Sequence, residues 1–116
     1  MPNIRSRETV AERLWDWGFL NPAFPGRIRP MDLDGIVEKN GKFLVLEGKP
    51  LGHGLPTGQK MTLDRMAAKD DFSVVVLFGE PGQPKQMKVL GHHDAPIDCT
   101  KEDVLRLVEA WVESVT

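Results

Sequence analysis

The dipeptide Asn40-Gly41 constrains how the residues on either side of it fold. A two-residue hairpin turn of type I′ requires positive φ angles at both positions, and asparagine and glycine adopt such angles at little cost. The turn predicts an antiparallel hairpin over 31–50 in which Lys39 lies opposite Lys42. Counting outward along the two strands predicts the remaining pairs, which are Val37 with Leu44, Asp34 with Glu47, and Asp32 with Lys49.

Four charged residues share one face of this predicted hairpin. Because side chains alternate between the two faces of a strand, the register groups Asp32, Asp34, Glu47 and Lys49. Directly paired residues lie about 5 Å apart at Cβ, which is close enough for two carboxylates to share a divalent cation. The alternative is a solvated face with a weak surface ion pair. Apolar residues occur on both faces, so we expect the hairpin to be largely covered and favour a functional site.

The rest of the sequence alternates between helical and extended patterns. The first pattern predicts a helix from about Ser6 to Trp17, which Gly18 ends. Residues 27–30 form either a short edge strand or an extended lead-in to the hairpin. The later patterns predict a helix over 57–69, a buried central strand over 72–78, a weaker strand over 85–90, and an amphipathic helix that begins at Thr100.

These elements predict an α/β fold with a mixed sheet. A strand that follows a helix can join the hairpin through a right-handed crossover, which makes the strand over 72–78 parallel to the second hairpin strand. We expect one domain over 1–116 with the order α-β-β-β-α-β, followed by a C-terminal strand and helix. Helices that cover the sheet would make three layers, with the charged residues near one end.

Two predicted helices could add side chains to the charged face. Gln59 shares a helix face with Leu63 and is expected to turn toward the sheet, although residues at helix starts also commonly bond the preceding loop. Glu8 and Glu12 lie one turn apart on the first helix and could reach the same pocket. For each of them a solvated position near the helix N-terminus explains the sequence equally well.

Composition and charge narrow the class of protein. There is no apolar run long enough to span a membrane, no signal-peptide segment, and a single cysteine, Cys99, so we expect a cytoplasmic protein without an internal disulfide. Residues 1–69 carry 11 Lys and Arg against 8 Asp and Glu, whereas residues 70–116 carry 4 against 9. A polyanion is therefore expected on the hairpin side.

Trp15 and Trp111 are expected in the core or at a dimer interface.

Three short motifs resemble the PD-(D/E)xK nuclease superfamily. They are Asp34, the triplet Glu47-Gly48-Lys49 that begins thirteen residues later, and Gly58-Gln59 at the start of a helix. The chain is most similar to the small phage-associated and virus-type replication-repair members and to archaeal-type Holliday junction resolvases, over roughly residues 6–78. The resemblance implies a restriction-endonuclease-like core.

The same resemblance implies roles for individual residues. It makes Asp34, Glu47 and the Gly48 carbonyl ligands of the metal, and Lys49 the catalytic lysine. Glu8 stands where some members place a helix glutamate, and Gln59 where several place a glutamine. Leu33 precedes Asp34 where the superfamily has proline, so Asp32 could share the metal role, and Glu12 is a further candidate.

The implied function is a Mg²⁺-dependent DNA endonuclease, with Mn²⁺ as a substitute. Carboxylate-bound Mg²⁺ neutralises charge on the phosphodiester, and a lysine on the same face as the second ligand can position the attacking water. Expected contacts to DNA phosphates come from Arg27, Arg29, Lys42 and Lys60. The small domain favours a homodimer or a larger complex, in phage or prophage replication, recombination or repair, inside a bacterial or phage-infected cell.

Other functions fit the sequence less well. The main alternative is a catalytically inactive nucleic-acid-binding or assembly protein with the same fold, against which the intact set of acids and lysine argues. A zinc site would have to use His53, His92, His93 and Cys99, whose spacing matches no closed structural pattern. The loop over 52–58 lacks the ending of a phosphate-binding P-loop.

Overall fold

The computed structural model describes residues 15–116. The chain divides after Met31 into two units, of which the first is described from Trp15 onward. Within the described residues there is no helix that is both long and apolar enough to cross a membrane.

The first unit contains the short 3₁₀ helix η1 (Trp17–Ala23). Asp16 begins it, because its Oδ1 accepts a hydrogen bond of 2.8 Å from the backbone N–H of Gly18. The prediction that an α-helix ends at Trp17 and Gly18 is therefore wrong at these residues, since Asp16 starts a new helical turn there. Residues 6–14 of that predicted helix, with Glu8 and Glu12, lie outside the described residues.

Residues 27–30 pair with no strand and form the extended lead-in, not the short edge strand. Pro30 has no N–H to donate to a sheet, which disfavours a strand at this point. Among the described residues, two strands instead of the expected three precede the crossover helix.

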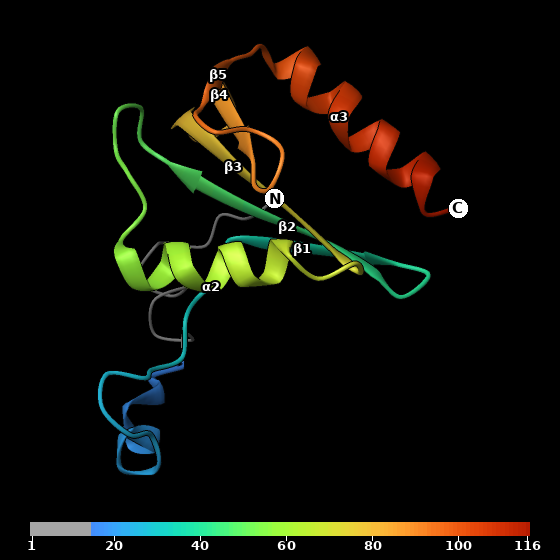
Figure 1. The fold of residues 1–116 in the computed structure, drawn as a ribbon. Coiled ribbons are helices and arrows are strands. Elements are labelled where there is room, and N and C mark those ends of the chain that lie inside the picture. The colour runs from blue at the N-terminus through green and yellow to red at the C-terminus, as the bar shows by residue number, and fades with distance from the viewer. Residues whose placement is uncertain (1–14) are drawn as a thin grey trace, which may run out of the picture. The chain divides into compact units, whose positions relative to one another are not determined.

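The second unit is an α/β structure with a five-stranded mixed sheet in the order β1-β2-β3-β4-β5 (Figure 1). The strands are β1 (Gly35–Lys39), β2 (Lys42–Lys49), β3 (Phe72–Glu80), β4 (Gln83–Val89) and β5 (Ile97–Asp98). Helix α2 (Thr57–Ala67) connects β2 to β3, and these two strands are parallel, as the crossover predicts. The other neighbouring strands are antiparallel. The two-residue strand β5 was not predicted.

The hairpin has the predicted turn and register. Asn40 and Gly41 have φ angles of 54° and 80°, and Lys39 pairs with Lys42. The ladder begins at Gly35, however, because the chain bends at Asp34. The predicted pairs that involve Asp34 and Asp32 are therefore not part of the ladder. The hairpin was expected to be largely covered, but this is confirmed only for β2. The strand β1 is the edge of the sheet, and most of its side chains are exposed.

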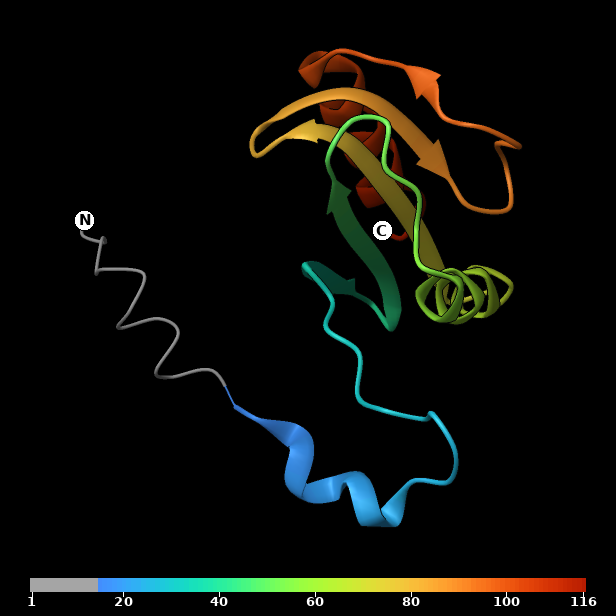
Figure 2. The ribbon, with the colours of Figure 1, turned by 90° about the vertical axis from the view of Figure 1, so that its left-hand side faces the viewer.

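The two faces of the sheet are covered by different helices (Figures 1 and 2). On one face the buried residues of β2 and β3 pack with Leu63 of α2; these sheet residues are Val45, Val74, Val76 and Phe78. On the other face, α3 (Lys101–Ser114) contributes Leu107 and Trp111 to a cavity of about 360 Å³ that Leu44 and Val75 also line. Thr100 begins α3 with a capping box, as predicted.

Candidate functional site

Glu47 is the one charged side chain that is buried among the described residues, with 4% of its surface exposed. It lies near the end of β2, on the face of the sheet that α2 covers. A carboxylate removed from water costs several kcal/mol unless other groups compensate its charge and its lone pairs. The contacts of Glu47 therefore define the candidate site.

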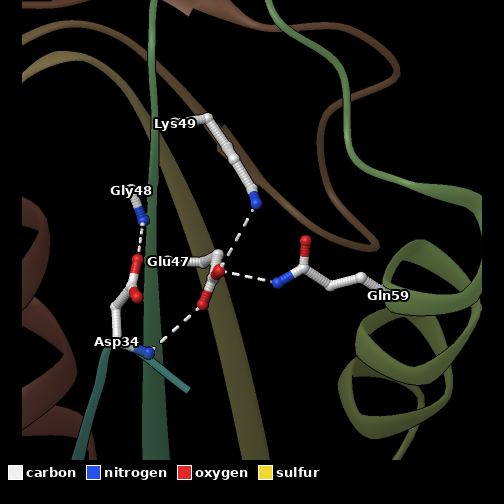
Figure 3. A network of polar contacts seen from close by, with 5 residues as sticks. All are labelled: Asp34, Glu47, Gly48, Lys49 and Gln59. Carbon is white, nitrogen blue, oxygen red and sulfur yellow. Dashed lines mark hydrogen bonds and ion pairs between the residues drawn. The ribbon is translucent and has the colours of Figure 1, made fainter. Parts of the chain in front are cut away.

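Three residues contact the Glu47 carboxylate (Figure 3). Its Oε2 accepts a hydrogen bond of 2.6 Å from Nε2 of Gln59 and lies 3.8 Å from Nζ of Lys49. Its Oε1 accepts a longer hydrogen bond of 3.3 Å from the backbone N–H of Asp34. The structure thus brings together four residues that the sequence singled out, from β2, from α2 and from the chain just before β1.

The local sequence explains this geometry. Glu47 and Lys49 are two residues apart on β2, so their side chains leave the same face of the sheet. Gln59 precedes the fully buried Leu63 by one helical turn and shares its face of α2. Of the two readings of Gln59, the structure shows the one in which the side chain turns toward the sheet.

Asp34 lies beside the site in a way that the strand register did not predict. Its carboxylate Oδ2 accepts a hydrogen bond of 2.8 Å from the backbone N–H of Gly48, and so continues the pairing of β2 beyond Gly35. The Asp34 side chain is exposed. Asp32 is also exposed and makes no hydrogen bond or ion pair among the described residues, so it does not join this network.

One oxygen of the site has no partner. Gln59 Oε1 is buried and is the only buried side-chain nitrogen or oxygen of the described residues without a hydrogen bond. The orientation of the amide follows from its neighbour, because only the NH₂ group can donate to the Glu47 carboxylate. The carbonyl oxygen is thus left to accept from, or coordinate, something outside the protein.

A cavity of about 510 Å³ adjoins these residues at the carboxyl ends of the parallel strands β2 and β3. Ligands of open α/β sheets commonly bind at such ends. Its lining includes Asp34, Glu47 and Lys49, together with the turn from Gly79 to Pro84. The sequence analysis missed this turn as part of the site. The Gly-Glu-Pro-Gly motif directly after the apolar run was the available signal, because it places a turn at the end of a central strand.

The basic residues expected to contact DNA are divided between the two units. Lys42 pairs with Asp71 at 2.7 Å, and this hydrogen bond and the charge of Asp71 raise the pKa of Lys42. Lys60 pairs with Asp64 at 2.7 Å on the exposed side of α2. The other two candidates, Arg27 and Arg29, belong to the first unit. Each of the two lysines thus has an acidic partner in an exposed ion pair.

Within residues 15–116, no three His, Cys, Asp or Glu side chains are grouped so that they could hold a metal ion. Within these residues the structure therefore gives no support to a zinc site made of the histidines and Cys99. The Nδ1 atom of His93 already accepts a hydrogen bond from the N–H of Val89. The oxygen donors near Glu47 come from two carboxylates, an amide and the main chain.

In comparisons with known proteins, the chain matches no protein-family model, no curated protein and no solved structure.

Proposed function

We propose that the protein is a Mg²⁺-dependent DNA endonuclease whose site is built on Glu47, Lys49, Gln59 and Asp34. The observation that carries the proposal is the buried Glu47 carboxylate, which has a lysine and an amide on one side and a cavity beside it. Burial of an acid next to an unpartnered amide oxygen serves ligand binding better than it serves stability.

The donor atoms fit Mg²⁺. This ion prefers oxygen ligands and is commonly held by one or two carboxylates, with water and substrate phosphate in the remaining positions. Asp34 and Glu47 would supply the carboxylates, and the Gly48 carbonyl and Gln59 Oε1 would supply further oxygens. A carboxylate oxygen offers two lone-pair directions, so the hydrogen bonds that Glu47 already accepts leave room for a cation. Bound Mg²⁺ would neutralise charge on the phosphodiester and lower the pKa of a bound water.

The other roles in the proposed reaction fall to the side chains of Lys49 and Gln59. Lys49 Nζ lies 3.8 Å from Glu47, and Lys49 also lines the cavity, so its charge would stabilise the charge that develops on a phosphate bound there. Gln59 holds the Glu47 carboxylate in one orientation through its 2.6 Å hydrogen bond. Much of the cavity lining is apolar, and a substrate that covered it would strengthen these charge interactions.

The proposal includes membership of the PD-(D/E)xK superfamily, with a three-layer restriction-endonuclease-like core. The supporting observations are the hairpin, the crossover helix α2 and the parallel strand β3, with a helix on each face of the sheet. The proposed substrate is DNA, and a homodimer or larger complex is the proposed assembly. Phage or prophage DNA metabolism in the bacterial cytoplasm remains the proposed setting.

One observation favours the alternative, a nucleic-acid-binding protein without activity. Each oxygen of Glu47 already accepts a hydrogen bond, and Asp34 is satisfied by Gly48, so the network is nearly complete without a ligand. A binding protein with such a network should not respond to divalent metal ions.

A cleavage assay separates the two functions. Purified protein is incubated with supercoiled plasmid or single-stranded DNA in Mg²⁺, Mn²⁺ or EDTA. We expect metal-dependent nicking that Glu47→Ala and Lys49→Met abolish. The matched control is Lys85→Met, which removes an exposed lysine of β4 that does not line the cavity and should cleave normally. Equal cleavage by the wild type and both site variants would contradict the proposal.

A metal titration tests the ligand set without relying on activity. Mn²⁺ should raise the melting temperature of the wild type, and Asp34→Asn should remove most of this increase. No change of melting temperature in the wild type, together with no cleavage of any DNA form, would favour the inactive binding protein.

A further inference from the structure

The first 31 residues differ in composition from the rest of the chain. All five of their basic residues are arginine, and they hold two of the three tryptophans and two of the five phenylalanines. Five Arg against three Asp and Glu give this segment a net charge of +2, whereas ten basic against fourteen acidic residues give residues 32–116 a net charge of −4. Arginine binds phosphate through several donors and stacks on planar rings, which lysine does less well.

The described part of this segment presents three aromatic rings to solvent. Trp15, Trp17 and Phe19 are 72%, 42% and 66% exposed. The rings of Trp15 and Trp17 are stacked, with centroids 5.4 Å apart and planes 17° apart, and the Phe19 ring follows at 6.4 Å from Trp17. Trp15 therefore does not lie in the core, and of its two expected places only the dimer interface is left as a prediction. Three adjacent exposed rings of this size form a surface that monomeric proteins rarely leave without a function.

The net charge of the described part of this segment is +1, from two arginines and one acid, which favours an anionic ligand. The single acid of the described segment is Asp16, whose Oδ1 accepts the N–H of Gly18 at the start of η1 and whose charge offsets one of the two arginines. Arg27 and Arg29 are exposed, and NH1 of Arg29 is held by the carbonyls of Gly26 and Ile28. The guanidinium of Arg29 is thus fixed in orientation, with its other N–H groups available.

We propose that residues 15–29 bind single-stranded nucleic acid. Because Trp15 and Trp17 already stack on each other, unpaired bases would stack on the outer faces of the cluster that Trp15, Trp17 and Phe19 form, while Arg27 and Arg29 contact the phosphates. Stacking needs an exposed base face, which a duplex hides between its neighbouring pairs, so the surface should prefer single strands. This inference rests on the proposed function in that the ligand is a nucleic acid, but it depends on none of the residues of the Glu47 site.

The test is a fluorescence titration of the full chain in EDTA, where no cleavage occurs. The probe is an oligothymidylate of about 15 nucleotides, and a duplex of the same length is the comparison. We expect quenching of tryptophan fluorescence by the single strand and a dissociation constant about tenfold or more higher for the duplex. Trp15→Ala and Trp17→Ala should each raise the dissociation constant by roughly 5- to 150-fold.

Three further variants keep the test interpretable. Trp15→Phe with Trp17→Phe preserves two aromatic rings and should retain most of the affinity, measured by anisotropy of a labelled oligonucleotide. Trp111→Phe removes the tryptophan of α3 and should leave the affinity unchanged. Lys85→Met, in β4 and outside residues 15–29, should also bind normally. Because binding is measured in EDTA and cleavage in Mg²⁺ or Mn²⁺, a failed nuclease assay and a failed binding assay remain distinguishable.

Two results would overturn the inference. The first is unchanged affinity for the single strand after both alanine substitutions, since the rings would then contribute nothing. The second is a concentration-dependent dimer in size-exclusion chromatography that the alanine variants abolish, without oligonucleotide binding by the wild type. The rings would then be a contact between copies of the chain.

Discussion

Replacement of Glu47 by glutamine should leave the stability of the fold nearly unchanged while it removes a carboxylate of the proposed metal site. Glutamine has the shape of glutamate, and its oxygen can still accept the N–H of Asp34. Its NH₂ group would face Nε2 of Gln59, but a half-turn of the Gln59 amide presents the unpartnered Oε1 instead. The two amides would then hydrogen-bond each other, and Gln59 Nε2 would take the place of the unpartnered Oε1, so one buried polar atom lacks a partner before and after the substitution.

The loss of the Glu47 charge has two effects on the free energy of unfolding, and these nearly cancel each other. At the 3.8 Å separation of Lys49 Nζ and Glu47 Oε2, the direct attraction is on the order of 4 kcal/mol for an effective dielectric constant near 20. The cost of burying the carboxylate is of similar size and disappears with the charge. Lys49 remains partly exposed and can be hydrated. We therefore expect Glu47→Gln to change the free energy of unfolding by less than about 1 kcal/mol.

Alanine at the same position is the informative comparison. Glu47→Ala leaves the Gln59 amide and the Asp34 N–H without their acceptor, at about 1–3 kcal/mol for each group that water does not reach. A total loss of about 2–4 kcal/mol is expected. Urea unfolding at neutral pH measures both variants, with the m-value as the check that unfolding stays two-state.

The metal response completes this prediction. Mn²⁺ at about 100 times its dissociation constant should stabilise the wild type by about 2.7 kcal/mol and should stabilise neither variant. If glutamine costs as much as alanine, the charge of Glu47 is what holds the fold, and the reasoning that the acid is buried for function is wrong.

Three other predictions follow from single features. Gly79→Ala should cost about 2–4 kcal/mol in urea unfolding, because φ is 152° and a Cβ would lie 2.3 Å from the Gln83 carbonyl oxygen. The control is Gly82→Ala, which has a φ of 74° and open space around it and should cost about 1 kcal/mol. Equal losses of stability in the two variants would refute the steric argument. Burial raises the pKa of the Cys99 thiol, so at pH 8 the folded protein should contain less thiolate and react with iodoacetamide more slowly than the urea-unfolded chain; an equal or faster rate would contradict this. Thr100→Ala removes the N-cap of α3 and should cost about 1 kcal/mol by thermal unfolding, and Thr100→Ser should recover most of it.

The predictions that the structure confirms depend on local chemistry. Asn40-Gly41 determines the register because few residue pairs tolerate two positive φ angles in succession. The run from Phe72 to Phe78 is apolar on both faces, as a central strand between two helices requires. Gln59 faces the sheet because the helical period aligns it with Leu63.

The features that the sequence did not reveal depend on contacts between distant residues. The pair Asp34 and Glu47 is close in space, but Asp34 turns its carboxylate to the main chain of Gly48, which the strand count alone does not show. The two-residue strand β5 exists only because β4 offers it a partner. The exposure of β1 follows from its place at the sheet edge, which its own alternating sequence does not determine.

The crossover between β2 and β3 has a consequence for the order of folding. All four residues of the proposed site lie between positions 34 and 59, whereas β2 and β3 pair residues 29 positions apart, such as Phe43 and Phe72. Closing a loop of that length is the slow step in forming a parallel pair of strands. The residues of the proposed site lie within or next to this loop, so the site forms when β2 and β3 pair. The hairpin, α2 and β3 therefore form a candidate folding nucleus that carries the site, while α3 contacts the sheet through residues far along the chain. Substitutions that weaken α3 should speed unfolding more than they slow folding, and the geometry around Glu47 should be the first part of the chain to become native-like.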